Sequence, residues 1–178
     1  MPPILVSLRE DHRNLRRLLA ILDAEIAVFE RAETPDYDVV TEILDYTREH
    51  MDRFHHPAED LVYARLQKRH PEASGTTHDL LDDHVRLEQQ TQHFSDVMHA
   101  IAEGTEMSRA RVLEAAKAYL AAQSRHLEVE ETWVFPDAER YLTEADWAEI
   151  EQEAESSLDP LFGDREGAGF SKLRALLG

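Results

Sequence analysis

The feature that most constrains the fold is the recurrence of apolar residues at spacings of three and four along most of the chain, as in Leu8, Leu15, Leu19 and Leu22. This spacing puts apolar side chains on one face of an α-helix and does not match the alternation of a β-strand. The pattern predicts long amphipathic helices over about residues 4–33, 36–70, 78–103 and 108–141.

Helix-breaking residues separate these stretches. Pro35 ends the first stretch and Gly104 closes the third. Between the second and third stretches, Pro71 and Gly75 mark a loop. Long helices joined by short loops pack as antiparallel neighbours, so the sequence predicts an all-α, up-down-up-down four-helix bundle over about residues 4–141.

A short helical extension is expected after the bundle. Thr143 is followed three residues later by Asp146, which predicts a helix N-terminus and a helix at about 144–155. The stretch SSLDPLFGDREGAGF predicts a loop, and a last helical turn or two should follow Ser171. A chain of 178 residues is the size of one domain, so we expect a single domain over 1–178, with residues 142–178 as its extension.

Composition excludes several classes of function. A net charge of -18 argues against nucleic acid and anionic membranes as partners, because both require clustered basic residues. The sequence predicts no membrane-spanning segment and no secretory signal, so we expect a cytoplasmic protein. We also expect a monomer or homodimer. The chain has no cysteine, so its metal ligands must be nitrogen or oxygen atoms.

Polar residues interrupt the apolar face of every predicted bundle helix. Carboxylates at buried positions cost several kcal/mol unless a positive charge compensates them, and no Lys or Arg lies on these faces. A cation bound by imidazole and carboxylate supplies that charge, and His-x-x-x-Glu places two such ligands one turn apart. The candidate metal ligands are His12, His55, Glu59, His84, His126 and Glu130.

Helix geometry and an internal repeat bring these residues together. His12 and the His55–Glu59 pair lie about equally far from the first loop, so they stand at one level in antiparallel helices. The same holds for His84 and the His126–Glu130 pair around the third loop. His84 follows the middle loop more closely than His55 precedes it, which predicts a longer non-helical connection there.

The repeat pairs EDHRNL with DDHVRL, and HHPAEDLVY with HLEVEETWVF. Each half of the bundle therefore carries a His, His, Glu set. Two such sets suit two metal ions that share both glutamates, with the sharing itself an inference.

At these residues the chain resembles the hemerythrin-like HHE cation-binding family, over about residues 8–140. The resemblance rests on His12, His55-x-x-x-Glu59, His84, His126-x-x-x-Glu130-Glu131 and the WVFP segment. It implies a four-helix bundle around an oxo- or carboxylate-bridged di-iron centre. The oxygen carriers of the family have His-x-x-x-His in the third helix, whereas this chain has His84-x-x-x-Glu88, which argues against reversible oxygen carriage.

The leading functional hypothesis is a non-haem di-iron protein that binds or turns over O2, peroxide or nitric oxide. An iron sensor or carrier without catalysis is the main alternative. A hydrolytic or structural zinc or manganese site is the third, because imidazole and carboxylate also bind those metals. Whether the protein is an enzyme stays open.

Residues next to the candidate ligands have their own expected roles. Pro57 should kink its helix and turn His55 and Glu59 toward the site. His56 lies about 100° around the helix from His55, so we expect it at the rim or in solvent. Glu88 is expected to be a seventh ligand, a solvated carboxylate, or a carboxylate that supports a ligand from behind.

The remaining histidines and aromatic residues are expected to have structural or surface positions. We expect His50 to pack against the core or to support a ligand from behind. The residues predicted in the core are Tyr63, Phe94, Tyr119 and Trp133, and those predicted on the surface are His70, His78, His93 and His99.

Overall fold

Every regular element in the described part of the chain is helical, which confirms the all-α fold. The computed structural model describes residues 1–154, 159–163 and 169–177. Its elements are α1 (Pro3–Glu30), α2 (Tyr37–Tyr46), the π-helix η1 (Thr47–His55), α3 (His56–Arg69), the 3-10 turn η2 (Pro71–Ala73), α4 (Ser74–Ala102), α5 (Arg109–Val129), the π-helix η3 (Glu130–Val134), α6 (Phe135–Tyr141), α7 (Glu144–Glu153) and α8 (Ser171–Leu177).

Polar side chains begin several of these helices. Asp36 accepts hydrogen bonds from the backbone N–H groups of Asp38 and Val39 in α2, and Ser108 accepts one from Arg111 in α5. Thr143 and Asp146 bond to each other's backbone N–H groups, which confirms the predicted start of α7. Residue 155 and much of the predicted loop before Ser171 lie outside the described residues.

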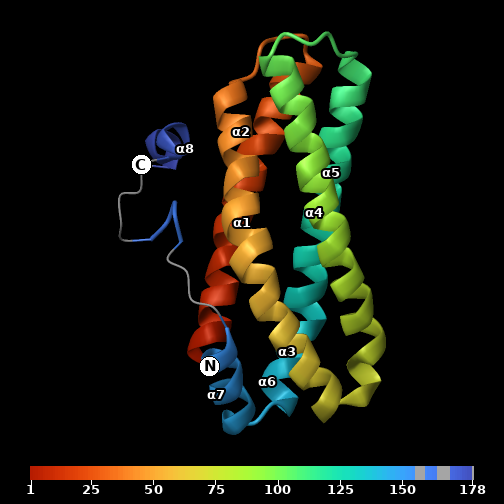
Figure 1. Ribbon diagram of the computed structural model, residues 1–178, viewed down its shortest axis with the longest axis vertical. Helices are drawn as coiled ribbons and strands as arrows, with labels where there is room; N and C mark the ends of the chain where they lie inside the picture. Colours follow the sequence, from red (N-terminus) through yellow and green to blue (C-terminus); the bar gives the residue numbers. More distant parts are fainter. Residues whose placement is uncertain (155–158, 164–168, 178) are drawn as a thin grey trace.

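The long segments form a helical bundle (Figure 1). Helix α1, the α2–α3 segment, α4 and the α5–α6 segment run side by side along the long axis, and α7 lies near the start of α1. Helix α8 lies beside α2, where Glu42 accepts hydrogen bonds from the backbone N–H groups of Lys172 and Leu173. No helix of the described residues is long and apolar enough to cross a membrane.

The apolar core consists of two clusters, one toward each end of the bundle. The first includes Leu15, Leu18, Leu22, Ile43, Leu44, Phe94 and Tyr119. The second includes Leu5, Val62, Tyr63, Leu66, Leu80, Phe135 and Ile150. The candidate ligands belong to neither cluster, so polar groups occupy the level between two apolar regions.

A π-helix precedes a proline in two of the long segments. Helix η1 ends shortly before Pro57, and η3 ends shortly before Pro136. Proline has no N–H group, and its ring displaces the carbonyl of the preceding turn. The wider π-helical turn accommodates this defect. The distortion predicted at Pro57 is therefore present as a π-helix.

Trp133 was predicted in the core, and this prediction is wrong. The side chain is 64% exposed, whereas the neighbouring Val134 is 2% exposed. The reason is η3, because a π-helical turn contains an extra residue and shifts the buried face by one position. The other predicted core aromatics, Tyr63, Phe94 and Tyr119, are fully buried.

The predicted longer connection before α4 is also wrong. The α-helix α4 begins at Ser74, so Gly75 lies inside its first turn. The turn η2 directly precedes α4 and rises about 2 Å per residue, more than an α-helix does. Because α4 begins at Ser74 and not at about residue 78, its additional first turn supplies part of the length that a longer loop was expected to provide.

The shifted register of η3 predicts a reversal in the cost of two neighbouring substitutions. Val134→Ala should lower the free energy of unfolding by about 2 kcal/mol, because it leaves a cavity in place of the buried methyl groups of Val134. Trp133→Ala should cost less than about 1 kcal/mol, because most of its ring is in solvent. Urea denaturation of both variants measures the difference. A larger loss for Trp133→Ala would contradict the register.

Candidate metal centre

All six predicted ligands converge in the middle of the bundle. They come from α1, from the η1–α3 junction, from α4 and from the α5–η3 junction. Each is at most 7% exposed, and Glu59 and Glu130 are fully buried. The structure therefore brings together every residue of the predicted set.

Glu59 lies among histidines from both halves of the bundle. Its Oε1 atom is 3.1 Å from Nε2 of His12 and 3.0 Å from Nε2 of His55. Its Oε2 atom is 3.4 Å from Nε2 of His84. One carboxylate thus faces three imidazoles, each through the ring nitrogen that points inward.

Glu130 occupies the corresponding position in the second half. Its Oε2 atom is 3.4 Å from Nε2 of His12 and 3.3 Å from Nε2 of His126. Its Oε1 atom is 3.8 Å from Nε2 of His84 and accepts a hydrogen bond from the Tyr63 hydroxyl. The Nε2 atoms of His84 and His126 are 3.1 Å apart. Both glutamates therefore contact histidines from the two halves.

The donor atoms form two groups that meet at Glu59. The first contains His12, His55 and Glu59, and the second contains His56, Glu59, His84 and His126. Within each group the donor atoms lie within 4.8 Å of one another. One carboxylate is thus shared by two imidazole-rich groups, each of which could hold a metal ion.

The donor set fits a metal cation. Nε2 of His55, Oε2 of Glu59 and Oε2 of Glu130 are buried and have no hydrogen-bond partner among the described residues. Buried polar atoms are almost always satisfied, so three such atoms without a hydrogen-bond partner at one level indicate a bound ligand. Imidazole nitrogen and carboxylate oxygen are donors that iron, zinc and manganese all accept.

Three carboxylates support the histidines from behind. In each case the ring nitrogen that points away from the centre, Nδ1, donates to a carboxylate oxygen, which fixes the ring so that Nε2 faces inward. The pairs are His12 with Glu131 at 3.0 Å, His55 with Asp11 at 3.0 Å and His84 with Asp60 at 2.8 Å.

Sequence reasoning did not assign these roles to Asp11, Asp60 and Glu131. A signal was present, because each is the chain neighbour of a predicted ligand. Adjacent helical residues point about 100° apart, so each carboxylate faces a neighbouring helix and supports a ligand there.

His56 was expected at the rim or in solvent, and this expectation is wrong. It is 5% exposed, and its ring stacks on that of His84 with centroids 4.3 Å apart. Burial and the neighbouring charge of His84 hold its pKa well below the usual value, so His56 is neutral. His56 begins α3 directly after η1. The expectation used the angle between successive side chains in an α-helix, and the π-helix changes that angle.

His50 and Glu88 are placed more nearly as expected. His50 is buried, and its Nε2 atom lies 3.2 Å from Oδ1 of Asp11, behind His55. Glu88 is exposed and belongs to neither donor group. Its exposure is that of a solvated carboxylate, whereas the six predicted ligands are buried.

The metal-free centre is held by protonated histidines. Burial would lower the pKa of His55, but the charge of Glu59 and the hydrogen bond to Asp11 raise it to about 10. Burial would likewise lower the pKa of His84, but hydrogen bonds, first of all to Asp60, raise it to about 11. These imidazolium groups supply the positive charge that a metal would otherwise provide.

The glutamates have the opposite shift. Burial would raise the pKa of Glu59, but the positive charge of His55 and hydrogen bonds from other histidines hold it well below its usual range. Burial and the charge of Glu59 would raise the pKa of Glu130, but His126 lowers it. Both carboxylates are ionised at neutral pH and available to a cation.

These shifts predict opposite pH dependences for the metal-free and metal-bound protein. A histidine with a raised pKa stabilises the fold below its unfolded pKa of 6.5, and that contribution is lost as the pH rises to about 10. The metal-free protein should therefore lose stability over this range. Metal binding requires neutral imidazole, so the metal's stabilising effect should grow as the pH rises toward about 10, where His55 loses its proton.

Urea unfolding at several pH values, with and without Fe2+ under nitrogen, measures both effects. A metal-free protein that becomes more stable between about pH 7 and 10 would contradict the assigned charges.

The comparison with known proteins agrees with this geometry. The family model described as the hemerythrin HHE cation-binding domain matches residues 4–138. No curated protein matches the sequence. The matched region contains all six converging residues and covers most of the chain, which confirms the resemblance seen in the motifs. The chain therefore belongs to the hemerythrin HHE cation-binding family, whose members bind metal cations, typically iron.

Proposed function

We propose that the chain is a di-iron protein that binds or turns over a small oxidant, namely O2, peroxide or nitric oxide, inside an up-down-up-down four-helix bundle. The observation that carries this proposal is the pair of donor groups that meet at Glu59. The proposed ligands are His12, His55, Glu59, His84, His126 and Glu130.

The distances support a division of these ligands between two ions. His12 and His55 serve one ion, because both lie about 3 Å from the same oxygen of Glu59. His84 and His126 serve the other, because their Nε2 atoms are 3.1 Å apart. Glu59 and Glu130 each contact both sets, so we assign them as bridges.

A bound iron pair supplies two redox-active ions with coordination positions left for a small ligand. The protein side chains position the ligands and exclude bulk water. Asp11, Asp60 and Glu131 keep Nδ1 of their histidines protonated, which leaves Nε2 free to bind metal. The Tyr63 hydroxyl donates to Glu130 and fixes one carboxylate oxygen.

Access to the centre favours a small reactant. The six proposed ligands are almost fully buried, so no large substrate can contact them directly. A cavity of about 390 Å³ beside α1 and η1 is lined by Leu8, Asp11, His50, His55 and Ala58, among others. It reaches the outer side of His55, which supports entry of a diatomic molecule or peroxide.

The first expected result is a stoichiometry of about two iron ions per chain. Glu59→Ala should lower the iron content of both positions, because it removes the donor that both groups share. His99→Ala is the matched control, since His99 is exposed and lies outside the donor groups. Elemental analysis after growth with iron measures the content. One zinc and no iron in the unaltered protein would overturn the di-iron assignment.

The second expected result concerns reactivity. The reduced iron protein should be oxidised by air or peroxide to a stable diferric state and should react with nitric oxide, because each ion has only about four protein donors and needs roughly two more. Absorption spectroscopy of the anaerobic protein during titration with each oxidant follows the change. Bound iron that reacts with none of them would favour the carrier or sensor alternative. Fully reversible oxygen uptake would contradict the assignment of open positions.

A further inference from the structure

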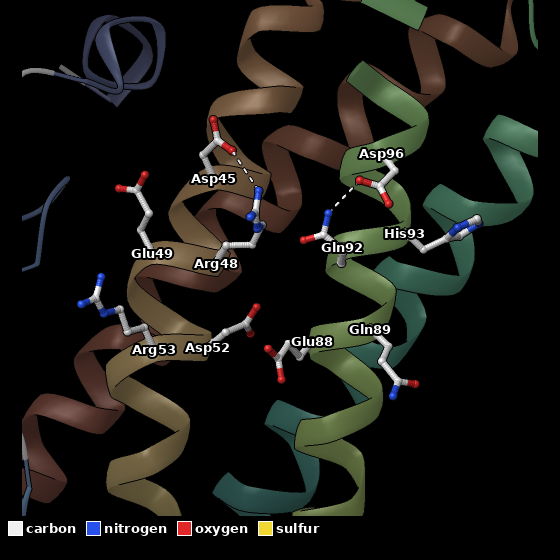
Figure 2. A pocket seen from close by; sticks show the side chains of 10 residues that line it. All are labelled: Asp45, Arg48, Glu49, Asp52, Arg53, Glu88, Gln89, Gln92, His93 and Asp96. Carbon is white, nitrogen blue, oxygen red and sulfur yellow. Dashed lines mark hydrogen bonds and ion pairs between the residues drawn. The ribbon is translucent and has the colours of Figure 1, made fainter. Parts of the chain in front are cut away.

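A polar cleft separates η1 from α4 on the side of the bundle where His56 lies. Its volume is about 710 Å³, and acidic, basic and amide side chains line it. Asp52 from η1 and Glu88 from α4 point toward one another across the cleft (Figure 2). The proposed ligand set uses neither of these two carboxylates.

Asp52 is largely buried and lacks a hydrogen bond to its carboxylate. Its side chain is 9% exposed, and neither carboxylate oxygen has a hydrogen-bond partner in the described residues. The cleft contains two arginines. Neither donates a hydrogen bond to Asp52, although the charge of Arg48 lowers the pKa of Asp52. Arg48 lies 4.0 Å from Asp45, and the guanidinium of Arg53 lies over the ring of Phe54. The buried carboxylate therefore faces the cleft with its lone pairs unused.

The electrostatics of the cleft favour a cation. Burial and the negative charge of Glu88 raise the pKa of Asp52 to about 7. Two facing carboxylates repel one another unless a positive charge lies between them. Hard divalent cations bind such oxygen pairs and keep several water ligands, for which an open polar cleft has room.

His56 connects this cleft to the metal centre. Its Nδ1 atom lies 3.4 Å from Oδ1 of Asp52, one helical turn earlier. Its ring stacks on that of His84 and meets that of His126 edge-on. It also shares a donor group with Glu59 and both of those histidines. A single neutral side chain thus separates Asp52 from the proposed second ion.

We propose that Asp52 and Glu88 bind a hydrated divalent cation in this cleft, and that the cleft is the loading site from which ferrous iron reaches the centre past His56. The loading role rests on the proposed di-iron function, whereas the cation site itself does not. No bond other than metal coordination is made or broken, and water ligands are exchanged for imidazole and carboxylate.

The cation site is tested with Mn2+ added to the protein as purified. The electron paramagnetic resonance signal of free Mn2+ should fall as one further ion binds, and Glu88→Gln should abolish this loss. Glu49→Gln is the matched control, because Glu49 also lines the cleft, is exposed and loses the same charge. Equal Mn2+ binding by the two variants would show that the facing carboxylates form no site.

The loading role is tested by the rate of Fe2+ uptake into metal-free protein under nitrogen. Glu88→Gln should slow uptake by about tenfold, since local charge concentrates cations near a site by at least that factor, and should leave the final iron content unchanged. Glu49→Gln should load at the rate of the unaltered protein. Because Glu88 is exposed and its charge repels Asp52, its substitution should not lower the melting temperature.

Two results separate this inference from the proposed function. Equal loading rates for Glu88→Gln and Glu49→Gln, with a full centre in both, would refute the loading role and leave the di-iron centre standing. Glu88-dependent Mn2+ binding in a protein whose centre retains no iron would confirm the cation site and refute the di-iron function.

Discussion

The burial of two carboxylates at the middle of the bundle is the constraint on which the rest of the structure depends. Glu59 and Glu130 are fully buried, and an uncompensated charge there would cost more than most single interactions provide. Positive charge must therefore be delivered to this level from several directions. Histidines from the surrounding helices do so, either as imidazolium or as ligands of a cation. The apolar core is divided into two clusters because this level cannot be apolar.

Periodicity was sufficient to find the helices and the converging residues, because helix geometry converts sequence spacing directly into direction and height. It failed where the backbone leaves that geometry. The π-helices change the number of residues per turn, so a count based on an α-helix misplaced Trp133 and His56. Proline marks such defects in the sequence, but proline alone does not say whether the chain kinks or widens its turn.

The carboxylates that support the histidines from behind show a different limit of prediction from sequence. Asp11, Asp60 and Glu131 each follow or precede a candidate ligand in the chain, yet each supports a histidine on another helix. Sequence spacing fixes the direction of a side chain relative to its own helix. Which neighbour it meets depends on helix order and rotation, which no local pattern contains.

The repeat that relates the two halves is incomplete among the carboxylates that hydrogen-bond Nδ1 of the histidines. His12 with Glu131 and His84 with Asp60 are equivalent pairs, and each histidine also stacks on an aromatic ring, Phe135 or Tyr63. The equivalent of Asp11, however, is Asp83, which pairs with Arg86 and Arg125 instead of supporting His126. Nδ1 of His126 therefore has no hydrogen-bond partner among the described residues.

His126 is thus oriented less firmly than His55, and it lies on the side where His56 adjoins the cleft. An ion exchanges most readily where its ligands can turn, because a ligand held from behind must break a second contact to leave the metal. The less supported half of the centre is consequently the half that faces the proposed entry route. The imperfect repeat gives the two halves of the proposed centre different supporting contacts, although the same residue types serve both.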